Sequence, residues 1–459
     1  MSTQYRTQNP ATNELIREYP TLTDAEAEAL LAKAHEAFLT WRFTPVEQRV
    51  EAYRRLSELL EKHSDALARQ ATLEMGKTLV ETSAEVLYQA KAMVDYYAGK
   101  AEELLAPKQL DVPGMQKIYT QREAVGVVLG IGPWNGPYYQ GLRVASPNIM
   151  LGNTVIGKPA PICAGSTLML DELFLDAGFP EGVYQTGLLS NEQVSKYIAD
   201  DRVRGVTFTG SDATGRIIAA QAGQHVKPTI LELGGSDPFV VLDSGDPIKA
   251  AANAGMCRMF IGGQVCCSPK RLIVTEKNAE PFIEQISAHF ANLKMGDPFD
   301  ESTNVGPLSS VEHADRVGAQ VQDAVDKGAK VLVGSGRVDG PGAWFSPTVI
   351  TGITPEMRMY SEEVFGPVAM VYVVPDNEAA LALANDTKYG LGGTVFAEDA
   401  DEAAHAARVI DAGMLGVNGW LGGPVEMPFG GTKASGYGRE LGEAGMDAFS
   451  NLKTYGVAG

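Results

Sequence analysis

Two short stretches of this sequence organise the rest of the chain. The first is Thr229-Ile230-Leu231-Glu232-Leu233-Gly234-Gly235, in which an acidic residue closes an apolar run, and the second is Gly263-Gln264-Val265-Cys266-Cys267, in which a cysteine follows a glycine-rich bend. A reacting cysteine must be, or become, a thiolate, and because its free pKa is about 8.5 it needs an activating neighbour or nearby backbone donors. The usual partner is histidine, but none of the six histidines lies in a glycine-rich motif. We therefore expect a carboxylate, Glu232, to act as the general base, which disfavours a papain-like hydrolase.

The two stretches resemble the glutamate motif and the cysteine motif of the aldehyde dehydrogenase superfamily. Further matches follow the family's order over nearly the whole chain: Pro133-Trp134-Asn135, Phe208-Thr209-Gly210-Ser211, Glu362-Glu363-Val364-Phe365-Gly366-Pro367 and the segment 428–440. Any one of these motifs would be weak evidence, whereas all of them in order are strong. The resemblance implies an α/β fold of the aldehyde dehydrogenase type, with a Rossmann-like cofactor domain, a catalytic α/β domain and a small β element for oligomer contacts.

Length, charge and cysteine content narrow the class of protein. The 459 residues allow about three domains of roughly 150 residues each. The formal net charge of −19 disfavours a nucleic-acid partner, because binding phosphates requires a basic surface. The four cysteines include an adjacent pair and show no zinc-ligand spacing, so we expect no metal, no disulfide framework and a reducing compartment. With no signal-peptide core and no apolar run near the ~18 residues of a membrane span, we expect a cytoplasmic protein without a membrane partner.

The order of apolar runs predicts how the domains are arranged. Short β-branched runs alternate with helical patterns between residues 125 and 240, and a less regular alternation follows to about 415. Such alternation predicts βαβ units in parallel sheets, with ligands at the carboxyl ends of the strands. We expect residues 1–105 and 125–236 to form the NAD(P)-binding domain and residues 237–442 the catalytic domain. Residues 106–124 and 443–459 are expected to form a hairpin and a strand; the pattern alone fits any surface hairpin, and the resemblance implies contacts in a homodimer or homotetramer.

The resemblance also assigns three catalytic roles. Cys266 would attack the aldehyde carbon, and Glu232 would activate the water that hydrolyses the resulting thioester. Asn135 lies in a Pro-Trp-Asn-Gly-Pro turn, where its amide and the backbone N–H of Cys266 would stabilise the oxyanion. Spacing alone leaves open that Asn135 is an ordinary turn asparagine. Cys267 matches no required role and is expected either to pack in the core or to be oxidised against its neighbour.

Several residues are predicted to bind a nicotinamide dinucleotide. Gly210, Ser211 and Gly215 flank a strand-to-helix turn whose N–H groups could hold a pyrophosphate, although the full G-x-G-x-x-G pattern is absent. Lys158 resembles the family lysine that holds the adenosine ribose. Pro161 stands where NAD-preferring members often carry a glutamate, so NADP is admissible beside NAD. The other cofactor-binding residues implied by the resemblance are Ile131, Pro133, Trp134, Leu233, Glu363 at the nicotinamide ribose and Phe365 beside the nicotinamide.

Two positions depart from the family pattern. Gly136 follows the asparagine where the family usually has an aromatic residue, so we expect a more open pocket wall. Ile261 takes the place of the asparagine that usually begins Asn-x-Gly-Gln. This second departure leaves the cysteine chemistry intact but puts the local support of the loop in question.

The expected substrate is succinic semialdehyde, oxidised to succinate through a cysteine thiohemiacetal and a thioester. The segments 231–238 and 294–298 look most like the bacterial succinate-semialdehyde dehydrogenase branch of the family. That branch places an arginine at the position of Arg143, and a planar guanidinium can bind a substrate carboxylate through two parallel hydrogen bonds. A helix salt bridge is the alternative for Arg143. Tyr139 and Trp420 could equally line a pocket for another aliphatic or aromatic aldehyde.

Three other functions stay open on the sequence alone. A related enzyme could transfer the acyl group to coenzyme A, although Glu232 favours water as the acceptor. A cysteine hydrolase would work without nicotinamide and would be expected to place a histidine base in a motif. A non-catalytic dinucleotide-binding protein would have no need to retain Cys266, Glu232 and Asn135 together.

Overall fold

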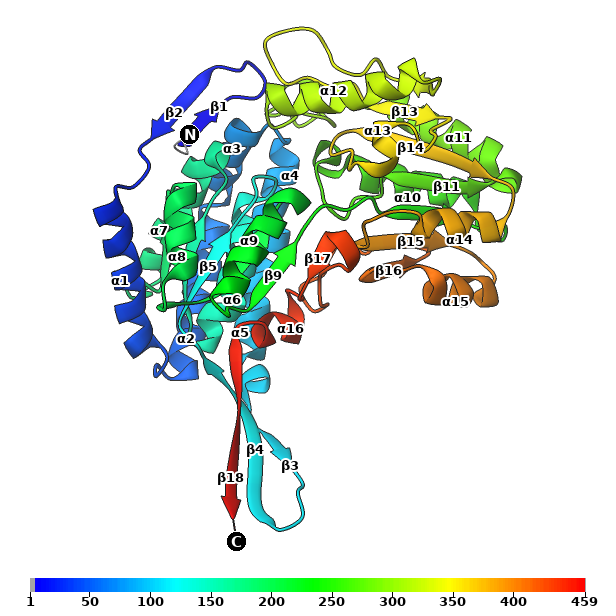
Figure 1. Ribbon diagram of the computed structural model, residues 1–459. Helices are drawn as coiled ribbons and strands as arrows, with labels where there is room; N and C mark the ends of the chain where they lie inside the picture. Colours follow the sequence, from blue (N-terminus) through cyan, green and yellow to red (C-terminus); the bar gives the residue numbers. More distant parts are fainter. Residues whose placement is uncertain (1–4, 459) are drawn as a thin grey trace.

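The computed structural model describes residues 5–458 and contains two α/β domains, with a small sheet that projects from the first (Figure 1). The first domain is built on a six-stranded sheet with the order β17-β9-β8-β5-β6-β7, parallel throughout except where β17 meets β9. Its strands are β5 (Val127–Ile131), β6 (Thr154–Lys158), β7 (Tyr184–Thr186), β8 (Val203–Thr209), β9 (Thr229–Glu232) and β17 (Gly436–Tyr437). The parallel order agrees with the βαβ units predicted from the sequence.

Helices cover both faces of this sheet. Val128 and Val155 pack in a core with α2, α5 and α6, whereas Leu129 and Ile156 pack in another with α1 and α8. Alternate side chains of a strand point to opposite faces, so the two cores lie on the two sides of the sheet. The helices of this domain are α1 (Asp24–Trp41), α2 (Val46–Lys62), α3 (Ser64–Met75), α4 (Leu79–Ala84), the π-helix η1 (Glu85–Ala90), α5 (Lys91–Leu105), α6 (Pro137–Leu151), the short 3₁₀ helix η2 (Pro161–Cys163), α7 (Ala164–Asp176), α8 (Asn191–Ala199) and α9 (Asp212–Gln224).

The helices at the start of the chain begin after Thr23 and Pro45, as capping and proline signals in the sequence predict, but they divide at points that the sequence pattern does not mark. Thr23 caps α1 in a reciprocal capping box with Glu26, and α2 begins after Pro45. The sequence pattern predicts one helix from Pro45 to the break at Met75-Gly76-Lys77, but the structure has two helices, separated at His63. The second of them, α3, ends at Gly76 with a φ of 81°. The helix that the pattern predicts from about Lys77 to Glu103 contains the π-helical turn of η1 between α4 and α5. Such turns frequently occur at functional sites, and this one packs against α6, which follows Asn135.

The second domain is built on a seven-stranded sheet with the order β12-β13-β14-β11-β10-β15-β16, in which only β12 is antiparallel to its neighbour. Its strands are β10 (Pro238–Val241), β11 (Arg271–Thr275), β12 (Lys330–Val333), β13 (Thr348–Thr351), β14 (Val368–Val374), β15 (Gly392–Phe396) and β16 (Met414–Val417). Its helices are α10 (Pro247–Met259), the short helix η3 (Phe260–Gly263), α11 (Glu276–Ala291), α12 (Val311–Asp326), α13 (Arg358–Ser361), α14 (Asn377–Asn385), α15 (Ala400–Val409) and η4 (Lys433–Ser435). Two further buried cores cover the two faces of this sheet.

The projecting sheet joins distant parts of the chain. It has the order β18-β4-β3, and its strands are β3 (Lys108–Leu110), β4 (Met115–Ala124) and β18 (Ser450–Ala458). Tyr119 and Tyr455 stack across it with ring centroids 5.0 Å apart. Helix α16 (Gly442–Asp447) leads into β18, and the hairpin of β1 (Tyr5–Gln8) and β2 (Leu15–Tyr19) forms a separate two-stranded sheet. Within residues 5–458, no helix is long and apolar enough to cross a membrane.

The two domains meet at the stretch that contains Glu232. Strand β9 ends at Glu232 in the first sheet, and β10 begins the second sheet at Pro238. The C-terminal motif returns to the same place, because Gly436 pairs with Glu232 between β17 and β9. Gly436 has a φ of 108°, and a Cβ there would lie 1.9 Å from the carbonyl oxygen of Leu231, so the close pairing requires glycine. The stretch that contains Glu232 and the C-terminal motif therefore meet at the junction of the two sheets.

Candidate active site

Two cavities meet at Asn135 and Cys266. One has a volume of about 120 Å³, and its lining includes Tyr139, Arg143 and Trp420. The other has a volume of about 230 Å³, and its lining includes Glu232 and Glu363. Asn135 and Cys266 are the two residues that line both cavities. An aldehyde in the first cavity and a dinucleotide in the second would therefore reach the same thiol from two sides.

The loop that carries Cys266 is shaped by an unusual backbone. Ile261, Gly262 and Gly263 all have left-handed φ values, of 53°, 58° and 74°. A Cβ at Gly263 would lie 2.3 Å from the carbonyl oxygen of Gly366, so this position requires glycine. Ile261 is β-branched, so its positive φ strains the backbone. It occupies the position at which the family usually has asparagine. The backbone N–H of Ile261 donates to Glu81 Oε1 at 2.7 Å, which answers in part the question of how the loop is supported.

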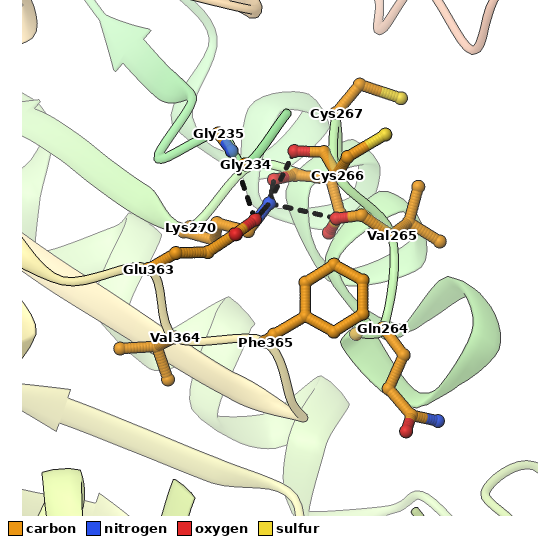
Figure 2. A network of polar contacts seen from close by, with 12 residues as sticks. Gly234, Gly235, Gln264, Val265, Cys266, Cys267, Lys270, Glu363, Val364 and Phe365 are labelled. Carbon is orange, nitrogen blue, oxygen red and sulfur yellow. Dashed lines mark hydrogen bonds and ion pairs between the residues drawn. The ribbon is translucent and has the colours of Figure 1, made fainter. Parts of the chain in front are cut away.

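Buried charges hold the same loop and adjust its thiol. Figure 2 shows Lys270, whose Nζ donates to the carbonyl oxygens of Val265 (2.9 Å) and Cys266 (2.6 Å). The pKa of the Cys266 thiol is lowered, first by a hydrogen bond with the Cys267 thiol and then by the positive charges of Arg143 and Lys270, against the opposing effect of burial. The thiol is thereby favoured as a thiolate, the form that attacks carbonyl carbon.

Asn135 sits in the turn between β5 and α6, on a buried ion pair. Its Nδ2 donates to the carbonyl oxygen of Gln264 at 3.0 Å, and an amide group has a second N–H that could serve an oxyanion. On the interior side of the turn, Lys77 pairs with Glu85, and its Nζ also donates to the Asn135 carbonyl oxygen at 3.2 Å. Glu85 Oε1 accepts the backbone N–H groups of residues 138 and 139, at 2.8 and 3.0 Å, in the first turn of α6. The turn is therefore held from the protein interior.

Glu232 ends β9 as a buried carboxyl group. Its side chain is 1% exposed, and within residues 5–458 neither oxygen has a hydrogen-bond partner. Burial raises the pKa of Glu232 well above its ordinary value, the positive charge of Arg143 lowers it, and the negative charge of Glu440 adds to the rise. A general base works best when its pKa lies near the working pH, and burial moves Glu232 in that direction.

Arg143, for which the sequence leaves both a substrate carboxylate and a salt bridge open, is buried beside two carboxylates of the protein. The guanidinium is 1% exposed, pairs with Glu440 and lies 3.6 Å from Glu232 Oε2. It also lies over the ring of Phe429, with 4.3 Å to the centroid. Arg143 lines the smaller cavity, and its observed partners are two carboxylates of the protein, one of which the tertiary fold brings from the C-terminal motif. Its role towards a substrate carboxylate stays a prediction.

The other predicted substrate residues lie in the smaller cavity. Tyr139 lies in the first turn of α6, and the indole Nε1 of Trp420 donates to the carbonyl oxygen of Cys267 at 2.9 Å. Cys267 itself is buried, and its pKa is raised well above the usual range, first by its hydrogen bond with Cys266 and then by burial. Its contacts within the described chain favour the packing interpretation. Gly136 also lines this cavity, at the wall that the sequence predicts to be open.

The larger cavity collects most of the predicted cofactor residues. Its lining contains Pro133, Trp134, Gly210, Ser211, Leu233, Glu363 and Phe365. Ser211 caps α9, accepting from the backbone N–H of Thr214 at 3.3 Å, and a Cβ at Gly215 would lie 2.5 Å from the Leu233 side chain. A Cβ at Gly234 would lie 2.4 Å from Glu363 Oε2, so the missing side chain leaves room beside that carboxylate. A close backbone approach, a capped helix N-terminus and a carboxylate for ribose hydroxyl groups are the features that a dinucleotide requires.

Ile131 and Lys158 lie outside this lining, at the ends of neighbouring strands. They are paired in the register of β5 and β6. The Lys158 side chain is buried, donates to the carbonyl oxygen of Pro159 at 3.1 Å and lies over the ring of Tyr5. Burial lowers its pKa. Pro161 begins η2 three residues later and offers no carboxylate beside the lysine.

Sequence reasoning missed several residues around the two cavities. His313 lies in α12, lines the larger cavity, and its Nε2 lies 2.6 Å from the carbonyl oxygen of Phe365. Burial lowers the pKa of His313 to about 4. Lys77, Glu85 and Lys270 were also missed, because a single lysine or glutamate in a helix or before a strand carries no periodic signal. Only Lys270 could have been suspected, from its closeness to Cys266 in the sequence.

The whole chain is similar in sequence and in structure to known proteins. The family model described as the aldehyde dehydrogenase family matches residues 1–455. The chain is 44% identical to a succinate-semialdehyde dehydrogenase [NADP(+)] of Deinococcus radiodurans and 42% identical to one of Mycobacterium avium, over 98% and 97% of this chain and 94% and 95% of theirs. A crystal structure of succinic semialdehyde dehydrogenase from Streptococcus pyogenes in complex with NADP+ superimposes with a TM-score of 0.96 at 38% identity, covering 99% of this chain and all of that one. The predicted fold class and resemblance are confirmed.

Proposed function

The chain belongs to the aldehyde dehydrogenase family, and we propose that it oxidises succinic semialdehyde to succinate with NADP as the preferred hydride acceptor. One observation carries the proposal: Asn135 and Cys266 lie where two cavities meet, with a buried carboxyl group in the lining of the larger one. Family membership makes the protein an NAD(P)-dependent oxidoreductase. The relatives named for NADP and the absence of a carboxylate at Pro161 support NADP over NAD.

In the proposed reaction the Cys266 thiolate attacks the aldehyde carbon and forms a thiohemiacetal. The Asn135 amide and the Cys266 backbone N–H hold the negative oxygen, and loss of one such donor commonly costs about 10²–10³ in rate. A nicotinamide bound in the larger cavity supplies the acceptor for the hydride that leaves the thiohemiacetal carbon. Glu232 then takes a proton from water, which attacks the thioester, and the carboxylic acid departs as the Cys266 thiolate is restored.

Binding of the cofactor is proposed to use residues from both domains. Pro133, Trp134, Leu233 and Phe365 would enclose the nicotinamide, and Glu363 would accept hydrogen bonds from its ribose. Gly210, Ser211 and Gly215 would approach the pyrophosphate at the N-terminus of α9, with Ile131 and Lys158 towards the adenosine. The features that support these roles are the strand ends, the capped helix and the close glycine approaches described above.

The substrate preference is the finer part of the proposal. Arg143 is the charged side chain among the described residues of the smaller cavity, so its field favours an anionic aldehyde, although Glu440 and Glu232 share that charge. Tyr139 and Trp420 would contact the methylene chain. We also propose a homodimer or homotetramer that assembles through the projecting sheet; the cytoplasmic location stays a prediction.

Initial rates of NADPH and NADH formation test this function. Succinic semialdehyde is compared with butanal and benzaldehyde, and Cys266→Ala is the blank. We expect thiol-dependent reduction, faster with NADP and with the semialdehyde. Equal or greater rates with the uncharged aldehydes would remove the substrate assignment and keep the class, whereas no reduction with any aldehyde would remove the proposed reaction.

A further inference from the structure

Lys270 is a fully buried lysine whose ammonium group adjoins the carbonyl oxygens of the Cys266 loop (Figure 2). Its Nζ donates to the carbonyl oxygens of Val265 at 2.9 Å, Cys266 at 2.6 Å and Ser268 at 3.2 Å. An ammonium group has three N–H donors, so these three carbonyl groups account for all of them. Burying such a charge is costly unless it is paired, and a lysine that served packing alone would be replaceable by an apolar residue.

The carboxylate that balances Lys270 belongs to the larger cavity. Glu363 Oε1 lies 3.2 Å from Lys270 Nζ, and the Glu363 side chain is 18% exposed where it lines that cavity. The same oxygen accepts the backbone N–H of Gly235 at 3.1 Å, in the stretch that follows Glu232. Through one oxygen, Glu363 therefore contacts the lysine beneath the thiol and the glycines beside the general base.

We propose that Lys270 is a positioning residue: it fixes the carbonyl groups of the Cys266 loop and shares its positive charge between the thiol and Glu363. The loop that carries the nucleophile and the cavity proposed for the cofactor are thereby joined through one ion pair. The reaction that this arrangement serves rests on the proposed function, whereas the state of the thiol does not depend on it.

The sign of each charge makes the proposal testable. Lys270 and Arg143 favour the Cys266 thiolate, whereas Glu363 disfavours it. The other titratable groups that interact with Cys266 are Cys267, Tyr139 and Glu232. Asp237 faces Lys270, and burial raises the pKa of that carboxyl group to about 7. Removing the lysine and removing its partner should therefore move the thiol in opposite directions.

The experiment measures alkylation of Cys266 by iodoacetamide in the protein without cofactor or aldehyde. The rate is followed by peptide mass spectrometry over a pH series that brackets the ordinary thiol pKa. For Lys270→Met we expect the midpoint to rise by about one pH unit, which slows alkylation at neutral pH about tenfold. For Glu363→Gln we expect the midpoint to fall by about half a unit, and for Lys270→Arg to stay near the wild-type value.

The matched control is Lys388→Met, which removes an exposed lysine paired with Asp212 and should leave the midpoint unchanged. Shifts of Lys270→Met and Glu363→Gln in the same direction, or no shift in either, would overturn the proposal, because a purely structural role predicts no opposition of sign. If Lys270→Met does not fold, a fall in the Glu363→Gln midpoint supports the proposal and its absence overturns it. A protein that shows the opposed shifts but oxidises no aldehyde would contradict the proposed function alone.

Discussion

Two buried lysine–glutamate pairs lie beneath the candidate catalytic residues, one on each side. Lys77 pairs with Glu85 and donates to the carbonyl oxygen of Asn135, whereas Lys270 pairs with Glu363 and donates to that of Cys266. Both lysines are fully buried. Each pair therefore holds the backbone of one of the two residues at which the cavities meet.

The partners of the two lysines differ in what else they contact. Glu85 is 2% exposed and accepts two backbone N–H groups at the start of α6, so its contacts are made within the protein. Glu363 is 18% exposed and lines the larger cavity, so a ligand can reach it. The difference teaches that similar ion pairs can serve two purposes. The first holds the backbone of Asn135 through contacts made entirely within the protein, and the second joins the Cys266 loop to a carboxylate that lines the larger cavity.

The largest effect should come from breaking the Lys77–Glu85 pair, whose contacts are made within the protein. Glu85→Gln leaves the Lys77 charge buried without its partner, and breaking a buried pair in this way costs about 3–5 kcal/mol in the free energy of unfolding. Urea denaturation followed by circular dichroism measures the change. The matched control is Glu61→Gln, at a surface pair with Lys91, which should change the free energy by no more than about 1 kcal/mol. A loss of unfolding free energy as small as that of Glu61→Gln would show that the buried Lys77–Glu85 pair contributes no more to stability than a surface pair.

A smaller effect, on cofactor binding rather than folding, should come from changing the Lys270–Glu363 pair, whose carboxylate lines the larger cavity. Glu363→Gln weakens the hydrogen bonds proposed for the nicotinamide ribose, and such bonds to a charged group contribute about 1.5–3 kcal/mol, so the Kd of NADPH should rise at least about tenfold. Titration of NADPH fluorescence measures it. Glu362→Gln, the exposed neighbour that pairs with Arg358, is the control and should retain the wild-type Kd. Unchanged affinity in Glu363→Gln would place the ribose elsewhere.

The smallest effect concerns a third buried pair, Arg143 with Glu440. The negative charge of Glu440 helps to raise the pKa of Glu232, so Glu440→Gln should lower that pKa and extend thioester hydrolysis to lower pH, by less than about one unit. The pH dependence of kcat measures the shift of the acid limb. Glu443→Gln, at a surface pair with Lys108, serves as the control. A limb that moves to higher pH would mean that Arg143, released from Glu440, no longer reaches Glu232.

The sequence predicted the elements and the motifs better than the contacts between them. Alternating β-branched runs predicted the parallel sheets, and the order of the motifs predicted the family. The division at His63 and the π-turn of η1 were not predictable, because both interrupt helical patterns that continue in sequence. Arg143 could be placed on a helix but not opposite Glu440, since that carboxylate comes from the far end of the chain.

By itself, the sequence determined which residues have the chemistry of this site: a cysteine after a glycine-rich bend, a carboxylate at a strand end and an asparagine in a proline-bounded turn. These three residues can be identified from local patterns in the sequence. Only the tertiary structure decided which charges stand beneath them. In the sequence these charges are ordinary basic residues: Lys77, Lys270 and Arg143. Folding removes the water around them and pairs each with a carboxylate. Because charges interact more strongly in the low dielectric of the interior, each pairing then affects the charge state of the groups nearby.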